Sequence, residues 1–331
     1  MTRHPKISIV MPVYNCERYV KRAIESILGQ TFRDFEFIIV NDGSSDQTLE
    51  ILKRFEYDDP RIRIITRENR GLVASLNEGV ACSQGEFIAR MDGDDIALPE
   101  RLKLQFNRMV GDKSLVLLGT RIVLVDEEGR PLMRWKHKYQ HEDIVPRLLN
   151  GDGSALTHPA VMMRRHAFDA VGGYDSRYGA NEDLDLFLKL SEIGRIANLE
   201  QVLLLWRQHS GSINANMAEL QHEFRILAVK EALFRRGADG FVTALMPSVT
   251  PSLQSRGPGF WADEAFRNKY YKTAIHYSRN LIFIPGSRLN GIRKIARCLK
   301  GLLQVLPRSC ARKIFKHRQS DVRVDRHIVG G

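Results

Sequence analysis

The first hundred residues alternate between apolar segments that suit buried strands and segments whose apolar residues recur at helical spacing. The strand-like segments cover residues 6–13, 35–40, 61–65 and 87–91, and the helical ones cover residues 17–28, 47–55 and 72–82. This alternation is typical of an α/β fold, in which helices flank a mostly parallel central sheet. Ligands of such sheets bind beyond the carboxyl ends of the strands, so the turns that follow these strands form the candidate site.

Polar turns follow three of the strands, at Pro12–Asn15, Asn41–Ser45 and Asp92–Asp95. The third turn places three carboxylates within four residues, and crowded like charges must be solvated, paired or bound to a cation. Mg²⁺ or Mn²⁺ would suit them, because these ions combine carboxylates with substrate phosphates. An acidic turn that caps the next helix is the alternative. Neither GxGxxG after the first strand nor GxxxxGK[ST] occurs, so a phosphate site here would need a metal.

Charge is distributed unevenly along the 331 residues. Residues 265–320 hold 14 Lys and Arg and no Asp or Glu, which leaves 36 Lys and Arg against 39 Asp and Glu elsewhere. The near-neutral remainder argues against nucleic acid as a partner. The start lacks a signal-peptide region, no stretch approaches the roughly 18 apolar residues of a membrane span, and the four cysteines lack paired spacing. We therefore expect a cytoplasmic protein with reduced thiols.

Eight short blocks together resemble the family 2 glycosyltransferases, and they follow one another in the family's order over residues 6–214. They are Ile9–Asn15, Val40–Asp46, Asn69–Gly71 with Ala74, Asn77 and Gly79, Asp92–Asp95, His158–Met162, Val171–Tyr174, Glu182–Leu186 and Trp206–His209. The resemblance implies the Rossmann-like GT-A fold and an inverting transfer from a nucleotide-sugar. It also implies a catalytic domain over residues 1–214, with a nucleotide-sugar half at about 1–97 and an acceptor half at about 98–214.

By this resemblance, the donor nucleotide is bound by residues of the first three blocks. The base pocket is assigned to Pro12, Val13, Tyr14 and Asn15, and Asn69 also belongs to the donor site. Asp42 would accept a hydrogen bond from the uracil N3–H, which only an acceptor can do. The alternative for Asp42 is to cap the helix that begins near Gln47, although Ser44, Ser45 or Asp46 could do so instead.

The resemblance assigns the metal, Mn²⁺ or Mg²⁺, to Asp94, and assigns Asp92 to the ribose or the metal. Asp95 is expected to cap the helix that follows Pro99. Arg90 has two open interpretations, a contact with phosphate or an ion pair within the acidic cluster.

The family's last block lies over the donor diphosphate, where cationic and donor groups would help. We therefore expect Arg207 to contact the diphosphate and His209 to contact the diphosphate or the metal. The same role is an open alternative for His158, because a lone histidine is more often structural.

Asp183 is the candidate catalytic base, which would take the acceptor proton as the hydroxyl attacks the anomeric carbon. One-step inversion needs only one such base, whereas a retaining double displacement needs a second carboxylate as nucleophile. Glu182, Asp183 and Asp185 begin a predicted helix, where the helix dipole also favours carboxylates whatever their function. Leu184 departs from the family, which usually has an aromatic residue there.

Residues 215–331 are predicted to form a basic, helical C-terminal extension, with a linker at 246–259. Residues 288–306 carry leucine and isoleucine at helical spacing, with arginine and lysine between them. Such a helix suits an anionic membrane surface. The alternatives are packing against the catalytic domain or an oligomer contact.

These observations together predict a metal-dependent, inverting glycosyltransferase on the cytoplasmic face of the inner membrane. It would transfer one sugar, most simply from a UDP-sugar, to a glycan or lipid-linked acceptor of cell-envelope polysaccharide such as lipopolysaccharide. The QxxRW motif and membrane helices of the processive synthases in this family are absent from the sequence. The rival hypotheses are a nucleotidyltransferase, whose glycine-rich first loop is missing, and a catalytically silent protein whose tail binds membrane or nucleic acid.

Overall fold

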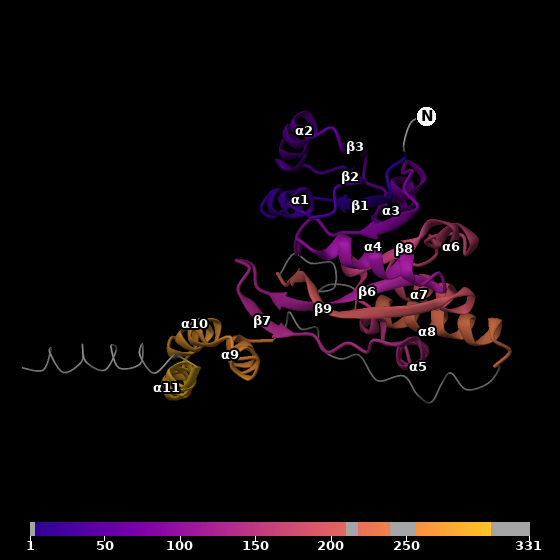
Figure 1. Ribbon diagram of the computed structural model, residues 1–331. Helices are drawn as coiled ribbons and strands as arrows, with labels where there is room; N and C mark the ends of the chain where they lie inside the picture. Colours follow the sequence, from indigo (N-terminus) through magenta and orange to yellow (C-terminus); the bar gives the residue numbers. More distant parts are fainter. Residues whose placement is uncertain (1–3, 210–217, 239–255, 306–331) are drawn as a thin grey trace, which may run out of the picture. The chain divides into compact units, whose positions relative to one another are not determined.

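The computed structural model describes residues 4–209, 218–238 and 256–305 (Figure 1). The chain forms two compact units, one of residues 1–130 and 134–255, the other of residues 131–133 and 256–331. The predicted linker at 246–259 lies mostly outside the described residues, as do Ser210–Ser212 and the basic residues beyond 305.

The strands are β1 (Ile7–Val13), β2 (Phe35–Asp42), β3 (Ile62–Arg67), β4 (Phe87–Arg90), β5 (Ile96–Ala97), β6 (Leu115–Val125), β7 (Pro131–Arg134), β8 (Met162–Arg164) and β9 (Arg195–Arg207). The helices of the first unit are α1 (Val20–Leu28), α2 (Thr48–Asp58), α3 (Leu72–Ala81), α4 (Arg101–Gly111), α5 (His141–Leu149), α6 (Arg165–Ala170), α7 (Glu182–Ile193) and α8 (Ala218–Arg235), with the 3₁₀ turns η1 (Gly153–Ala155) and η2 (His158–Ala160). The strands and helices predicted in the first hundred residues are all present, with boundaries shifted by a few residues.

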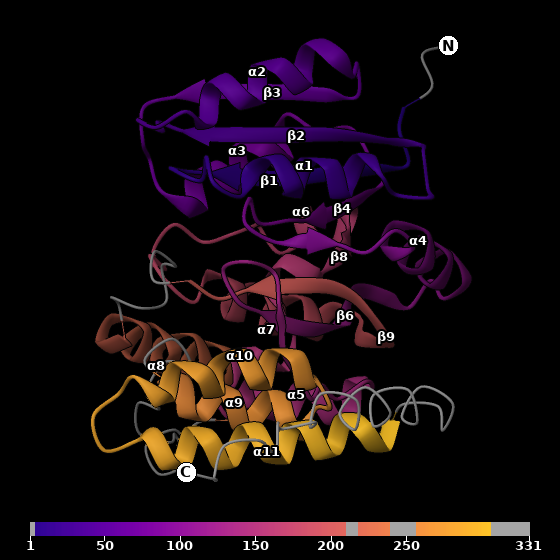
Figure 2. The same cartoon turned by 90° about the vertical axis from the view of Figure 1, so that its left-hand side faces the viewer.

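The main sheet has the strand order β3-β2-β1-β4-β8-β6-β9-β5. Its first four strands are parallel, as predicted, and each pairs with the next one in this order (Figures 1 and 2). Beyond β4 the sheet is mixed, because β8 runs antiparallel to both β4 and β6, and β5 runs antiparallel to β9. The expected α/β class is confirmed.

Helix α3 packs against the parallel half of the sheet through a glycine. Its buried side chains include Val73, Leu76 and Val80, at spacings of three and four residues that place them on one side of the helix. A Cβ atom at Gly79 would lie 2.5 Å from Val10 Cγ1. The glycine therefore allows the helix to approach β1 more closely than any other residue would.

Helix α8, which the prediction placed in the C-terminal extension, belongs to the first unit. Its residues Ala228, Val229 and Ala232 are buried in the same core as Tyr178 and Leu184. Small side chains at helical spacing allow α8 to lie close to α7. The predicted domain boundary at residue 214 therefore lies before α8, although α8 packs in the core of the first unit.

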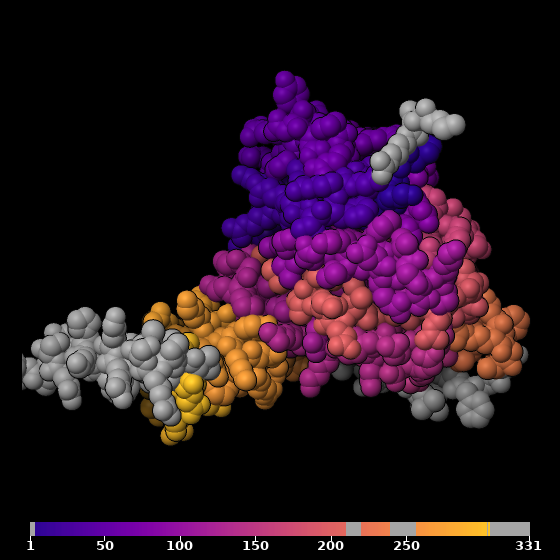
Figure 3. Space-filling model, in the orientation of Figure 1, coloured from indigo at the N-terminus to yellow at the C-terminus, as the bar shows by residue number. Residues whose placement is uncertain are grey.

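Besides residues 131–133, the described part of the second unit contains three helices: α9 (Pro258–Arg267), α10 (Tyr271–Ile282) and α11 (Arg288–Val305) (Figure 2). Ala265, Ala274 and Cys298 form its small core. In the space-filling view these helices are coloured orange to yellow (Figure 3). No helix among the described residues has the length and apolar content needed to cross a bilayer.

We expect Gly79→Ala to lower the free energy of unfolding by about 1–3 kcal/mol, because the added methyl group would overlap Val10 and approach Val40 Cγ2 to 3.2 Å. Urea denaturation monitored by circular dichroism would measure the change. Gly111→Ala in α4 is the matched control, since nothing lies within 4 Å of its Cβ position. Equal stability of the two variants would contradict close packing of α3 on β1.

Candidate active site

The ends of β1, β2 and β4 bring the three predicted turns together. Val13 pairs with Asn41 and Val10 pairs with Arg90, so these strands end side by side. The third turn also packs directly on the first, because a Cβ atom at Gly93 would lie 2.8 Å from Val13 Cγ1. The turns predicted from separate parts of the sequence therefore form one rim.

The first two turns are joined by hydrogen bonds. The Asn15 N–H donates to Ser44 Oγ (3.0 Å), and the Ser45 N–H donates to Asn15 Oδ1 (2.8 Å). Asn15 has a positive φ of 47°, a conformation that asparagine adopts more readily than most residues. Tyr14 is 53% exposed and Asn15 is exposed as well, while Pro12 and Val13 are buried, so this turn offers the tyrosine ring and the asparagine to a ligand.

Asp42 is buried and does not cap α2. Its carboxylate accepts hydrogen bonds from the N–H groups of Arg70 (2.8 Å) and Gly71 (2.9 Å), and it pairs with Arg67. Asp46 instead accepts the Thr48 N–H (2.9 Å) at the start of α2. Asp42 Oδ2 accepts one hydrogen bond among the described residues, so it retains acceptor capacity.

Asn69 is exposed at the turn that Asp42 holds. Its Oδ1 accepts a 3.2 Å hydrogen bond from the Gly71 N–H. Gly43 lies against the same turn with φ 73°, and a Cβ atom there would be 2.7 Å from the Asn69 backbone nitrogen. Asn69 is thus brought beside the end of β2.

The acidic turn holds Asp92, Asp94 and Asp95 with one carboxylate oxygen of each within 4.8 Å of the others. Burial raises the pKa of Asp92 and raises that of Asp95 well above its usual value, and the neighbouring carboxylates add to both shifts. Asp95 Oδ2 is buried with no hydrogen-bond partner among the described residues. The turn therefore holds more negative charge than the described partners balance.

Two buried arginines lie behind this turn. Arg90 makes an ion pair with Asp92, as one of its two open interpretations predicted. Its Nε and Nη1 atoms are inaccessible to solvent, which weighs against direct contact with phosphate. Arg101 donates through Nη2 to the Arg90 carbonyl (2.6 Å), and burial lowers its pKa to about 9. The sequence analysis missed Arg101, since an arginine at the start of a helix gives no sign of burial.

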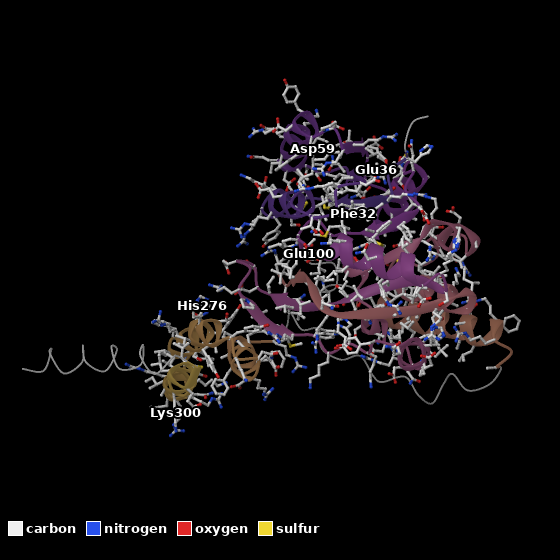
Figure 4. The ribbon with its side chains drawn as sticks, viewed as in Figure 1. Phe32, Glu36, Asp59, Glu100, His276 and Lys300 are labelled. Atoms are coloured by element: carbon white, nitrogen blue, oxygen red, sulfur yellow. The ribbon has the colours of Figure 1, made fainter. Side chains whose placement is uncertain are left out.

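The prediction that Asp95 caps α4 is wrong. The N-cap position is Glu100, labelled in Figure 4, and no side chain caps the helix there. Asp95 Oδ1 instead accepts the Arg207 N–H at 2.8 Å. The physical reason is β5, which follows Asp95 directly and pairs with β9, so that the end of β9 lies beside the acidic turn.

Arg207 and His209, at the end of β9, both contact this turn. The Arg207 guanidinium is buried and donates to the carbonyls of Asp94 (2.7 Å) and Glu127 (2.8 Å). His209 Nε2 lies 2.8 Å from Asp94 Oδ2, and its ring packs on Tyr19 at a centroid distance of 4.9 Å. Arg207 thus fixes the backbone of the turn, while His209 reaches a carboxylate.

The start of α7 approaches the rim from the other side. His158 Nε2 lies 2.8 Å from Tyr174 Oη, and His158 Nδ1 lies 3.6 Å from Glu182 Oε1. All three side chains are buried, whereas Asp183 is half-buried. His158 is therefore part of a buried polar group next to the predicted base.

Burial, together with the adjacent Asp183 charge, raises the pKa of Glu182 to about 8. Burial also raises the pKa of Asp183, which the Leu184 N–H bond (2.8 Å) and the charge of Arg90 oppose. Burial lowers the pKa of His158 well below its usual value. The raised pKa of Glu182 favours its protonated form near neutral pH, and the lowered pKa of His158 favours its neutral form.

We expect Glu182 to destabilise the wild-type protein increasingly as pH rises from about 5 to 8, because folded Glu182 holds a proton that the unfolded chain has already lost. Glu182→Gln removes this proton, so near pH 9 it should melt a few degrees above wild type while matching it near pH 5. Differential scanning calorimetry across pH measures this. The exposed Glu200→Gln is the control. Parallel curves for wild type and Glu182→Gln would contradict the prediction.

Comparison with known proteins connects this site to one family. The sequence model of the family described as "Glycosyl transferase family 2" matches residues 8–172. The O-antigen biosynthesis glycosyltransferase WbnJ of Escherichia coli is 33% identical over 243 residues, which is 72% of this chain and 93% of the relative. The hyaluronan synthase of Pasteurella multocida is 28% identical over 240 residues. The chain spans only about a quarter (24%) of that synthase's length.

Solved structures share the fold. Staphylococcus aureus TarS 1–349, solved with UDP-GlcNAc, is 18% identical with a TM-score of 0.55, over 90% of this chain and 92% of the solved TarS segment. The mannosyltransferase PcManGT of Pyrobaculum calidifontis, solved with GDP-Man and Mn²⁺, is 14% identical with a TM-score of 0.51, over 96% of this chain and 81% of PcManGT. The expected GT-A fold is confirmed. Since its similarity to WbnJ extends over nearly all of that relative, the chain belongs to glycosyltransferase family 2.

Proposed function

We propose that the chain is a metal-dependent, inverting enzyme that transfers a single sugar from a UDP-sugar to a glycan or lipid-linked acceptor in cell-envelope polysaccharide synthesis. The observation that carries this proposal is the rim itself. Asp42, the acidic turn and Asp183 come from three separate parts of the chain and surround the same strand ends, with Arg90 acting on the charges of the last two. The acidic turn, which would bind the leaving group, and Asp183, which would accept the proton, thus belong to the same edge of the sheet.

The nucleotide would lie over the ends of β1 and β2. Pro12–Asn15 would line the base pocket, where the exposed Tyr14 ring offers a surface on which a base can stack. Asp42 would accept the uracil N3–H through the capacity left on Oδ2. TarS was solved with UDP-GlcNAc and PcManGT with GDP-Man, so the shared fold supports a nucleotide-sugar donor, of which a UDP-sugar is the one we propose.

Asp94, Asp92 and His209 fit a divalent cation. One carboxylate oxygen each of Asp92, Asp94 and Asp95 lie within 4.8 Å of one another, and His209 Nε2 lies 2.8 Å from Asp94 Oδ2, so these side chains would hold the cation together. The unpaired Asp95 oxygen and the raised pKa values of Asp92 and Asp95 are consistent with a site that lacks positive charge. When bound, Mn²⁺ or Mg²⁺ supplies Lewis-acid stabilisation of the diphosphate. PcManGT was solved with Mn²⁺, which supports this proposal.

Asp183 would take the proton of the acceptor hydroxyl. Its half-buried carboxylate lies at the start of α7, where the helix dipole and the Leu184 N–H favour the ionised form. Glu182, whose raised pKa favours its protonated form near neutral pH, would not compete for this proton. One carboxylate base is sufficient for a one-step displacement, which inverts the anomeric configuration.

The acceptor belongs to the envelope polysaccharides because WbnJ, an O-antigen glycosyltransferase, aligns over most of its length with this chain. Hyaluronan synthase is about four times as long as the segment that aligns here, so transfer of a single sugar is the simpler proposal for this chain. A lipid-linked acceptor would place the enzyme on the cytoplasmic face of the inner membrane as a peripheral protein.

We expect Asp183→Asn to lower sugar transfer about 10²–10⁴-fold while UDP affinity stays within a few-fold of wild type, because this residue acts only on the acceptor proton. Asp94→Asn should instead weaken UDP binding in the presence of Mn²⁺ by about tenfold or more. Transfer assays with UDP-sugars and calorimetric UDP titrations, with and without Mn²⁺, would measure both effects.

Asp169→Asn, an exposed site in α6, is the matched control for removal of a carboxylate. UDP binding that is equally tight in EDTA would contradict the metal site. Wild-type transfer by Asp183→Asn would contradict the base, and salt-sensitive DNA binding without UDP affinity would contradict the enzyme altogether.

A further inference from the structure

One side of α11 is exposed and carries apolar side chains at helical spacing. Leu289, Ile292, Ala296 and Leu299 follow one another at intervals of three, four and three residues, which places them along the same side of a helix. Leu289 is 69% exposed, Ile292 47% and Leu299 49%. Such high exposure is unusual for three large aliphatic side chains that lie on the same side of one helix.

The opposite side of α11 packs against the other helices of its unit. A Cβ atom at Gly291 would lie 2.7 Å from the Ser278 carbonyl, and one at Gly301 would lie 2.6 Å from the Tyr271 ring. Cys298 is buried between these two glycines. The apolar residues of this helix therefore lie on two sides, one packed and one exposed, and the exposed ones are not needed for packing within the unit.

Basic side chains accompany the exposed apolar ones. Arg288, Arg293 and Lys300 are exposed, and no carboxylate pairs with them within the part of the chain that the structure describes. In Figure 4 the labelled Lys300 points away from α9 and α10. Residues 256–305 contain only two carboxylates, Asp263 and Glu264. We call Leu289, Ile292, Arg293, Ala296, Leu299 and Lys300 the α11 outer face.

The turn between α10 and α11 also exposes apolar side chains. Phe283 is 85% exposed and Ile284 is 39% exposed, and both precede the start of α11 by only a few residues. Both described carboxylates of the unit are already paired, Asp263 with Lys294 and Arg297 of α11 and Glu264 with Arg267 of α9. The outer face therefore presents apolar surface and basic side chains that pair with no carboxylate among the described residues.

We propose that the α11 outer face, with Phe283, lies in the interface of an anionic phospholipid bilayer. Its aliphatic side chains would enter the boundary between headgroups and acyl chains, while Arg293 and Lys300 contact lipid phosphates. A second copy of this face is a poorer partner, because pairing would bring like charges together. Nucleic acid would satisfy the charges and leave the aliphatic side chains in water. The inference deepens the proposed peripheral location, and it does not depend on the catalytic assignments.

Flotation of the full-length protein with vesicles tests this surface. The vesicles contain about one part phosphatidylglycerol to three parts phosphatidylethanolamine, and pure phosphatidylcholine vesicles are the neutral comparison. We expect flotation with the anionic vesicles to decrease at least tenfold in Leu289→Ser/Ile292→Ser, and to become weaker and less salt-sensitive in Arg293→Gln/Lys300→Gln. Phe234→Ser, which removes a 71% exposed phenylalanine from α8, is the apolar control. Lys53→Gln/Lys113→Gln, on the first unit, is the charge control.

Hydrolysis of UDP-sugar in the absence of membranes, measured on the same variants, separates this inference from the proposed enzyme activity. Normal hydrolysis with lost flotation supports the docking surface. Equal flotation of wild type and both α11 variants would overturn it, as would equal binding to neutral and anionic vesicles. Dimers in sedimentation velocity that disappear in Leu289→Ser/Ile292→Ser, without any flotation, would assign the face to a second copy instead.

Discussion

The buried guanidinium of Arg90 is the charge on which the arrangement of the rim depends. It pairs with Asp92 at the end of its own strand, and its field also acts on Asp95, Glu182 and Asp183. Removal of a buried cation from such a group would leave several carboxylates uncompensated, which is far more costly than the loss of one surface ion pair. Arg90 therefore holds together the part of the rim that would bind the leaving group and the part that would take the proton.

Strand β9 is the second element on which the acidic turn depends, because the C-terminal end of this strand lies beside the turn. Its pairing with β5 places Arg207 against the backbone of Asp94 and the carboxylate of Asp95. His209 then reaches the Asp94 carboxylate. A turn of crowded carboxylates would otherwise be free to rearrange, so these contacts fix its geometry before any ligand binds, and such preorganisation is what positions catalytic groups.

The second unit follows different principles. Its core is small, and its helices approach one another through glycines at 291 and 301 instead of large apolar side chains. This close approach uses one side of α11 and leaves leucine and isoleucine on the other side in contact with solvent. Exposed apolar surface among basic residues is the feature that distinguishes this unit from the catalytic one.

The sequence by itself determined the α/β class, the parallel first half of the sheet and the three turns of the rim. These follow from local periodicity and from the rule that parallel strands end at one edge. The ordered motifs also predicted Asp42, Asp94 and Asp183 as site residues, and these assignments remain predictions. Only tertiary contacts decide that the second half of the sheet is mixed, where α8 lies, which group Asp95 contacts, and that Arg90, Arg101 and Glu182 are buried. The physical reason is that strand pairing and desolvation depend on residues distant in sequence, such as Leu205 opposite Ile96, which no local pattern encodes.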